Sequence, residues 1–131
     1  MTRESRLPLL QALEAERGTN VITYVTSTRD NLNTSMAMDV VPILYRHLVD
    51  LPGDNDRAID LLLHTNGGDG VVPWRIVTLI REFCSNFAVL VPNRAFSAGT
   101  LTALGADKII MHPMGMLGPT DLHSYDRVQS N

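Results

Sequence analysis

The chain of 131 residues has one cysteine, Cys84, and no apolar run of membrane-spanning length. A single cysteine forms no disulfide within the chain, so the sequence gives no sign of an oxidising compartment, and its helix-like surroundings predict a buried thiol. A membrane-spanning helix needs roughly 18 to 20 apolar residues, and the N-terminal segment 1–6 is followed by no apolar signal core. We therefore expect a soluble, cytoplasmic chain, unless a removed segment once preceded it.

Clusters of positive charge are also missing. Eleven Lys and Arg residues are scattered along the chain against fourteen Asp and Glu, which gives a formal net charge of −3. Affinity for a phosphate backbone comes from clustered basic residues, so nucleic acid is not expected as a partner.

The spacings that mark common cofactor sites are absent as well. The four histidines and the cysteine are too far apart in sequence for a recognisable zinc site, which predicts no metal. Neither the dinucleotide fingerprint nor the P-loop pattern occurs, so we predict no cofactor.

The composition that remains is that of a globular protein. Hydrophobic residues make up 44% of the chain and charged residues 19%, and no repeat or low-complexity tract divides it. We expect one domain over residues 1–131. The segment after Pro119 is polar and without clear periodicity, which indicates that the chain stops where another unit could have begun.

Helical and strand-like patterns alternate along the chain. Apolar residues at helical spacing predict helices over 7–17, 36–51, 72–85 and 97–105, and alternating or continuous apolar runs predict strands over 20–27, 58–64, 87–91 and 108–111. This order predicts an α/β domain with a mainly parallel sheet. Ligands of such sheets bind beyond the carboxyl ends of the strands, where both Gly67-Gly68 and Ser97 are expected.

Ser97 is the first candidate for a chemical role. It lies between small residues in the segment 94–100, just after the strand predicted over 87–91. A serine at a tight turn that opens a helix can act as a nucleophile, with backbone N–H groups beside it to stabilise an oxyanion. The alternative is an ordinary helix N-cap, since serine is favoured at that position.

A glycine turn follows the neighbouring strand, at Gly67-Gly68. Consecutive strands usually lie side by side, so this loop and the Ser97 turn are expected to face each other. The N–H of Gly68 and that of Ala98 would then form an oxyanion hole, because a glycine lets the backbone approach a substrate carbonyl. The alternative is a strand-to-helix turn without a ligand.

Four segments in order, 61–68, 95–101, 104–111 and 117–121, resemble the serine dehydrogenase proteinase family. This family belongs to the Clp protease/crotonase superfamily and is related to signal peptide peptidase A. The resemblance spans about residues 6–121. It implies a Clp protease/crotonase-like spiral of ββα units, serine peptidase activity with Ser97 as nucleophile and Gly68 and Ala98 as oxyanion-hole amides, and assembly into rings or trimers. Asn66 stands where the superfamily commonly has proline.

The general base is the open question. His123 follows Ser97 by 26 residues, close to the separation in the Clp proteases, and Asp121 or Asp126 would orient it. An alignment on the strand 108–111 instead puts the histidine position near Thr120. A base beyond Asn131, a base from a neighbouring subunit, or no base at all are the further alternatives.

The other candidate bases have structural interpretations. His64 lies in an apolar strand and is expected to be a core residue, His112 a loop residue, and His47 a helix residue that faces solvent or packs. Lys108 is the only lysine and opens a strand after an aspartate, where it is expected to be solvated.

The sequence therefore predicts a serine peptidase that acts on a peptide or protein substrate and forms a homo-oligomer. The main alternative is a non-catalytic binding or scaffold member of the superfamily without a competent dyad. A crotonase-type acyl-CoA enzyme is a third interpretation, because it shares the pair of amides that binds an oxyanion.

Overall fold

The computed structural model describes residues 2–26 and 34–119 of the chain. Within these residues the elements are, in chain order, α1 (Arg3–Arg17), β1 (Asn20–Val25), α2 (Val40–Val49), β2 (Ala58–His64), α3 (Val72–Arg81), β3 (Asn86–Val91), β4 (Arg94–Ala95), α4 (Ala98–Leu104), β5 (Lys108–Met111) and β6 (Met116–Leu117).

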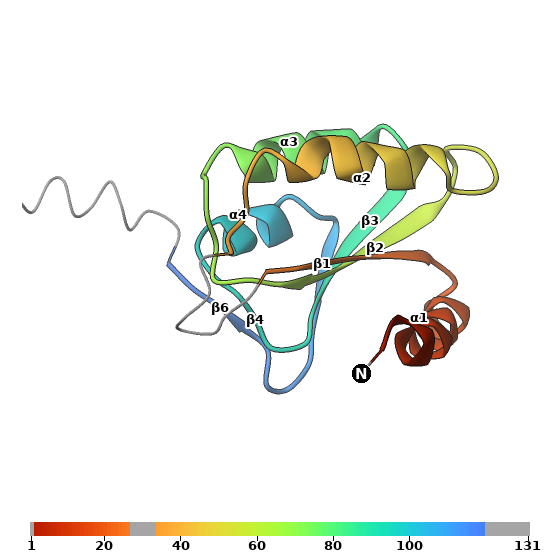
Figure 1. Ribbon diagram of the computed structural model, residues 1–131, viewed down its shortest axis with the longest axis horizontal. Helices are drawn as coiled ribbons and strands as arrows, with labels where there is room; N and C mark the ends of the chain where they lie inside the picture. The colour runs from red at the N-terminus through yellow and green to blue at the C-terminus, as the bar shows by residue number, and fades with distance from the viewer. Residues whose placement is uncertain (1, 27–33, 120–131) are drawn as a thin grey trace, which may run out of the picture.

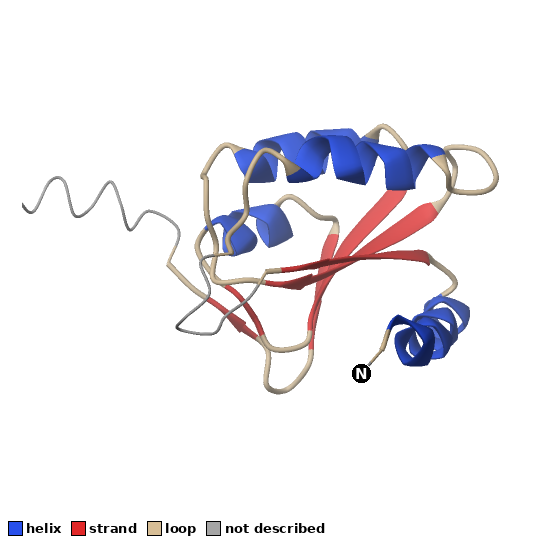
Figure 2. Ribbon diagram, in the orientation of Figure 1, coloured by secondary structure: helices blue, strands red, loops and turns tan. Residues whose placement is uncertain are grey.

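Four strands form one parallel sheet in the order β1-β2-β3-β5. Helices α2, α3 and α4 lie over one face of this sheet, and α1 lies on the other side (Figures 1 and 2). The core is between the sheet and the first group of helices, where Ile59, Leu61, Leu63, Ile76 and Val89 are buried. The predicted α/β fold with a mainly parallel sheet is confirmed.

Helix α1 is attached to the sheet mainly by polar contacts at its C-terminal end. None of its residues is buried. The Arg17 guanidinium donates to both carboxylate oxygens of Asp60 on β2, at 2.5 and 3.2 Å, and the hydroxyl of Thr19 donates to the same carboxylate at 2.9 Å. The hydrogen bond to Asp60 raises the pKa of Arg17, so the guanidinium keeps its charge.

A second, two-stranded sheet joins β4 to β6, also in parallel. The sequence did not predict it, because elements of two residues leave no periodicity to detect. A bridge between Thr65 and Ala95 connects the end of β2 to this small sheet. Thr65, at the start of the glycine loop, is thereby held against Ala95, in the chain that leads to Ser97.

Several predicted boundaries differ from those in the structure. The helix expected over 36–51 begins only at Val40, and Met36 is instead extended and buried, paired with Gly68. Pro42 is then the third residue of α2, where its missing N–H breaks no helical hydrogen bond. The helix expected over 72–85 ends at Arg81. Cys84 beyond it is half-buried, and burial raises the pKa of its thiol.

Candidate functional site

The glycine loop after β2 and the turn before α4 lie in contact, as the sequence predicted. The Thr65 N–H donates to the Arg94 carbonyl at 3.1 Å, and the Phe96 N–H donates to the Thr65 carbonyl at 3.0 Å. These two bonds fix the loop and the turn side by side. Both follow strands at their carboxyl ends, the edge where α/β sheets bind ligands.

Gly67 is the point of closest approach between them. A β-carbon on Gly67 would lie 2.6 Å from the Ser97 Cβ, 2.9 Å from the Phe96 carbonyl oxygen and 3.2 Å from the Ala98 nitrogen. Gly67 also has φ of 112°, which L side chains rarely adopt. This position therefore requires glycine for both space and conformation.

Ser97 has a strained backbone. Its φ is 53° and its ψ is −116°, and among the described residues it is the one non-glycine with a positive φ. Such conformations cost about 1 to 3 kcal/mol and persist where surrounding contacts enforce them, often at active sites. The sharp turn places the serine between β4 and the first residue of α4, the position that the nucleophile takes in the elbow turns of α/β-hydrolases.

The helix-cap interpretation of Ser97 is wrong. Ser97 occupies the N-cap position of α4, but its side chain accepts no hydrogen bond from the helix. An N-capping serine ordinarily accepts one from the N–H two or three residues ahead. The hydroxyl of Ser97 is therefore not used by the helix.

The N–H of Gly68 points away from Met36, whose backbone packs against Gly68. Met36 N–H donates to the Gly67 carbonyl at 2.8 Å, and Asp69 N–H donates to the Met36 carbonyl at 2.9 Å. Because successive N–H groups of an extended chain point to opposite sides, the Gly68 N–H points away from Met36. A β-carbon on Gly68 would lie 2.2 Å from the Met36 oxygen, so the two backbones touch.

The second amide of the predicted pair belongs to Ala98, the first residue of α4. Among the hydrogen bonds between described residues, neither the Gly68 N–H nor the Ala98 N–H is a donor. The first N–H groups of a helix have no partner within it and readily bind anions. Two amides that have no partner among the described residues thus lie next to the contact between Gly67 and Ser97.

Thr100 joins the chain at Gly118 to the chain that precedes Ser97. Its hydroxyl donates to the Ala95 carbonyl at 2.6 Å and accepts the Gly118 N–H at 3.0 Å. Gly118 also lies against the Phe96 ring, since a β-carbon there would be 2.8 Å from the ring. The described chain ends one residue later, at Pro119, beside the Ser97 turn. Asp121 and His123, the predicted orienter and base, are outside the described residues.

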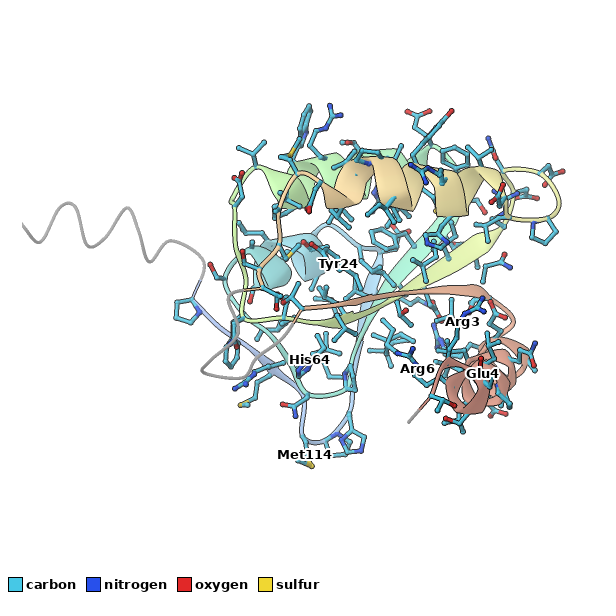
Figure 3. The ribbon with its side chains drawn as sticks, viewed as in Figure 1. Arg3, Glu4, Arg6, Tyr24, His64 and Met114 are labelled. Atoms are coloured by element: carbon cyan, nitrogen blue, oxygen red, sulfur yellow. The ribbon has the colours of Figure 1, made fainter. Side chains whose placement is uncertain are left out.

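His64, His112 and Lys108 each have surroundings other than the Ser97 turn. Leu63 and Thr65 point to the helix-covered side of the sheet, so His64 between them points to the opposite face, where Figure 3 shows it. The Nδ1 of His112 accepts the Met114 N–H at 3.1 Å in an exposed turn. Lys108 pairs with Ala88 near the amino ends of the strands, the far edge of the sheet from Ser97.

His47 has a different environment, on α2. It lines a cavity of about 590 Å³ between α1 and the sheet, together with leucines of α1 and with Val25 and Leu62. Ser97 does not line this cavity. This cavity is therefore separate from the Ser97 turn.

Tyr24 supports the segment that packs on Gly68. Burial raises the pKa of its phenol, and the Ala37 backbone N–H, which is directed at the phenol oxygen, opposes that rise. The phenol is therefore protonated at neutral pH, and it lies on the helix side of the sheet (Figure 3). Tyr24 thus fixes the chain next to Met36 rather than acting as a base.

Two further properties of the described residues bear on the predictions. Over 2–26 and 34–119, no group of three or more His, Cys, Asp or Glu side chains is arranged to hold a metal ion. In the same part of the chain, no helix has the length and apolar character needed to span a bilayer.

Sequence reasoning missed two residues that shape the loop. Thr65 and Thr26 are buried, with their hydroxyl oxygens 2.6 Å apart, and the Gly67 N–H donates to the Thr65 oxygen at 2.9 Å. A threonine two residues before a glycine turn is the one local signal for such a bond. Thr26, the residue after β1 that pairs with Thr65, had no such signal in the sequence.

Comparisons with known proteins show relatives in sequence and in fold. Two uncharacterized proteins of Methanocaldococcus jannaschii, MJ0137 and MJ1495, are 32% and 31% identical over 127 and 124 residues, which is 89% and 88% of this chain. The chain spans only 42% and 41% of their lengths. In structure, a mutant ClpP1 from Listeria monocytogenes superposes with a TM-score of 0.60 at 17% identity, covering 92% of this chain and 67% of that one.

The family-level comparison covers nearly the whole chain. Residues 1–127 match the family described as ClpP-like SDH-type serine proteinase. This match includes the glycine loop, the Ser97 turn and the segment that carries Asp121 and His123. The chain belongs to the ClpP-like SDH-type serine proteinase family.

Proposed function

We propose that this protein is a serine peptidase with Ser97 as its nucleophile. The observation that carries the proposal is the contact between Gly67 and the strained Ser97, with the partner-free amides of Gly68 and Ala98 beside it. A serine fixed in a sharp turn next to two unused N–H groups has the arrangement that acyl transfer requires.

In the reaction, the Ser97 hydroxyl oxygen attacks the carbonyl carbon of a peptide bond. The carbonyl oxygen becomes an oxyanion, and the N–H groups of Gly68 and Ala98 donate to it. The base takes the hydroxyl proton and later passes it to the leaving amine, which gives an acyl-enzyme that water hydrolyses. Removal of one oxyanion-hole donor typically lowers kcat by roughly 100- to 1,000-fold.

His123 is the proposed base and Asp121 the residue that orients it. Thr100 holds Gly118 beside the Ser97 turn, and the five residues from there to His123 span at most roughly 17 Å when extended. A connection this short supports the assignment of His123 as the base. Asp126 as orienter, or a base from beyond Asn131 or from another subunit, are the competing assignments.

The proposed substrate is a peptide or a protein, and the proposed assembly is a homo-oligomer. Large apolar side chains are exposed on the outer faces of the helices that cover the sheet, including Tyr45 on α2, Trp74 on α3 and Leu104 on α4. Apolar surface of this kind commonly marks a protein contact, which supports association.

A non-catalytic binding or scaffold protein is the second candidate. It is favoured by one observation, that Ser97 makes no hydrogen bond through its side chain to a base among the described residues. An acyl-CoA enzyme of the crotonase type is a third candidate, which calorimetry with a CoA thioester tests directly: no heat of binding excludes it.

A fluorophosphonate probe tests the proposal. The Ser97 oxygen forms a bond to phosphorus, the P–F bond breaks, fluoride leaves, and the base takes the hydroxyl proton. Ser97→Ala is expected to lose all labelling while its circular dichroism is unchanged. Ser85→Ala is the matched control and should label normally, because Ser85 is exposed and its hydroxyl bonds only to the Arg57 carbonyl and the Asn86 side chain. Labelling that survives Ser97→Ala would remove Ser97 from the mechanism.

A further inference from the structure

One buried side chain connects the three parts of the chain that make the site. Thr65, the residue after β2, is fully buried. Its backbone bonds to the chain on both sides of Ala95, and its methyl group lies against α4, where a β-carbon on Gly99 would be 2.5 Å from it. Its hydroxyl lies between the end of β1 and the glycine loop.

The hydroxyl of Thr65 is the hydrogen-bond acceptor of the Gly67 N–H. That N–H donates to the Thr65 Oγ1 at 2.9 Å, and the Thr26 hydroxyl lies 2.6 Å from the same oxygen. Whichever threonine donates in the pair, the Thr65 oxygen has a lone pair for Gly67. Gly67 is buried, so without this oxygen its N–H would lack both a protein partner and water.

The orientation of the Gly67 peptide determines where the next amide points. Gly67 follows Asn66 with a conformation open only to glycine, and its carbonyl accepts the Met36 N–H at 2.8 Å. Its N–H is held by Thr65, and its C=O is held by Met36 and also accepts the Thr65 hydroxyl at 3.4 Å. The N–H of Gly68 follows directly from this fixed unit and is directed away from Met36.

We propose that Thr65 is a positioning residue for the oxyanion-binding loop, and that Thr26, the residue after β1, supports it. This inference rests on the proposed function, because it assigns Thr65 a role in aiming the Gly68 N–H at the oxyanion formed on Ser97. The role belongs to the hydroxyl group. Serine at this position should therefore retain it, and valine, which has nearly the same shape, should lose it.

The experiment measures how fast a fluorophosphonate labels Ser97 in the full chain, with the maximal rate constant and the half-saturating probe concentration determined separately. Thr65→Val is expected to lower the maximal rate roughly 10- to 100-fold, as for a small misplacement of a reacting group or a weakened oxyanion donor. The half-saturating concentration should change less than twofold. Thr65→Ser should recover most of the rate.

Two further variants separate positioning from general stability. Ile80→Val removes a methylene from a fully buried residue at the end of α3, far from the loop, and should destabilise the fold without changing the maximal rate. Thr26→Val should give a smaller loss than Thr65→Val, because Gly67 keeps its acceptor. Amide hydrogen exchange at Gly67 should accelerate in Thr65→Val and stay slow in Thr65→Ser.

The outcomes are distinguishable. If the unaltered protein labels at Ser97 and Thr65→Val labels at the same maximal rate, the positioning role is overturned and the proposed function stands. A rate loss in Thr65→Ser equal to that in Thr65→Val would also overturn it, because the hydroxyl would not matter. If the unaltered protein does not label, both proposals fall together.

Discussion

A β-carbon on Gly67 would lie 2.6 Å from the β-carbon of Ser97. Real β-carbons essentially never come this close to a carbon they are not bonded to, so a side chain at Gly67 must displace the Ser97 turn. The candidate nucleophile and the glycine loop therefore have coupled positions, and a change at one is expected to alter the other.

Gly67→Ala is expected to abolish labelling of Ser97 and to destabilise the fold by about 1 to 3 kcal/mol, because it adds a methyl group to a filled space at a φ of 112°. Gly70→Ala is the matched control. Gly70 lies in the same loop and a β-carbon there meets nothing within 4 Å. Urea unfolding and probe labelling of both variants check this; equal effects at the two glycines would contradict the coupling.

Substitutions of Arg17 and of Asp60 are expected to lower the free energy of unfolding by different amounts. Asp60 has 1% of its side chain exposed and Arg17 has 29%. Arg17→Leu leaves a carboxylate buried without its cation and is expected to cost about 3 to 5 kcal/mol. Asp60→Asn should cost less, because Arg17 can turn towards water.

The free energy of unfolding from urea titration of both variants measures this asymmetry. A double variant with leucine at both positions should recover much of the loss, since an apolar pair replaces the charges. A larger loss in Asp60→Asn than in Arg17→Leu would contradict the burial that the structure assigns to the carboxylate.

Asp107 predicts a pH dependence of stability. The Phe87 N–H and then the Arg81 guanidinium donate to its carboxylate, and they hold its pKa below the ordinary value. A carboxylate whose pKa is lower in the folded state than in the unfolded state stabilises the fold at pH values above its unfolded-state pKa of about 3.9. That stability is lost as the pH falls through the folded-state pKa.

The difference in free energy of unfolding between the protein and Asp107→Asn should therefore be full from pH 5 to 7 and shrink below about pH 4. The carboxylate is nearly half exposed, so the full difference should be of the order of 1 kcal/mol. Urea unfolding at four pH values measures it. A difference that stays constant down to pH 3 would show that the charge of Asp107 is not responsible.

The base assignment predicts a pH profile. If His123 takes the Ser97 proton, the labelling rate should rise with pH as the imidazole loses its own proton, within the range of about pH 5 to 8 in which histidines change charge. His123→Gln should lower the rate and flatten this profile. His112→Gln, at an exposed turn, is the control. A profile unchanged in His123→Gln would move the base elsewhere.

The sheet and its helices could be predicted from the sequence because strands covered on both faces leave long apolar runs in it. The apolar run over 58–64 predicted β2 with the bounds that the structure shows. The alternation after Asn20 predicted β1, although its end was placed two residues too late. Elements of two residues, such as β4 and β6, carry no such signal.

Other features depend on contacts between distant segments. Met36 was assigned to a helix because its neighbours have helical spacing, but its backbone pairs with Gly68, far along the chain. For Ser97 the local pattern alone favoured an N-cap over a nucleophile. The approach of Gly67, thirty residues earlier, and the strained φ of Ser97 support the nucleophile interpretation.

A crystal structure of the protein after reaction with a fluorophosphonate tests the central claim most directly, because the phosphonyl oxygen occupies the place of the oxyanion. We predict continuous density from the Ser97 Oγ to phosphorus, with the phosphonyl oxygen about 2.7 to 3.1 Å from the nitrogens of both Gly68 and Ala98. A phosphonate on any other residue, or a phosphonyl oxygen that contacts neither amide, would contradict the account.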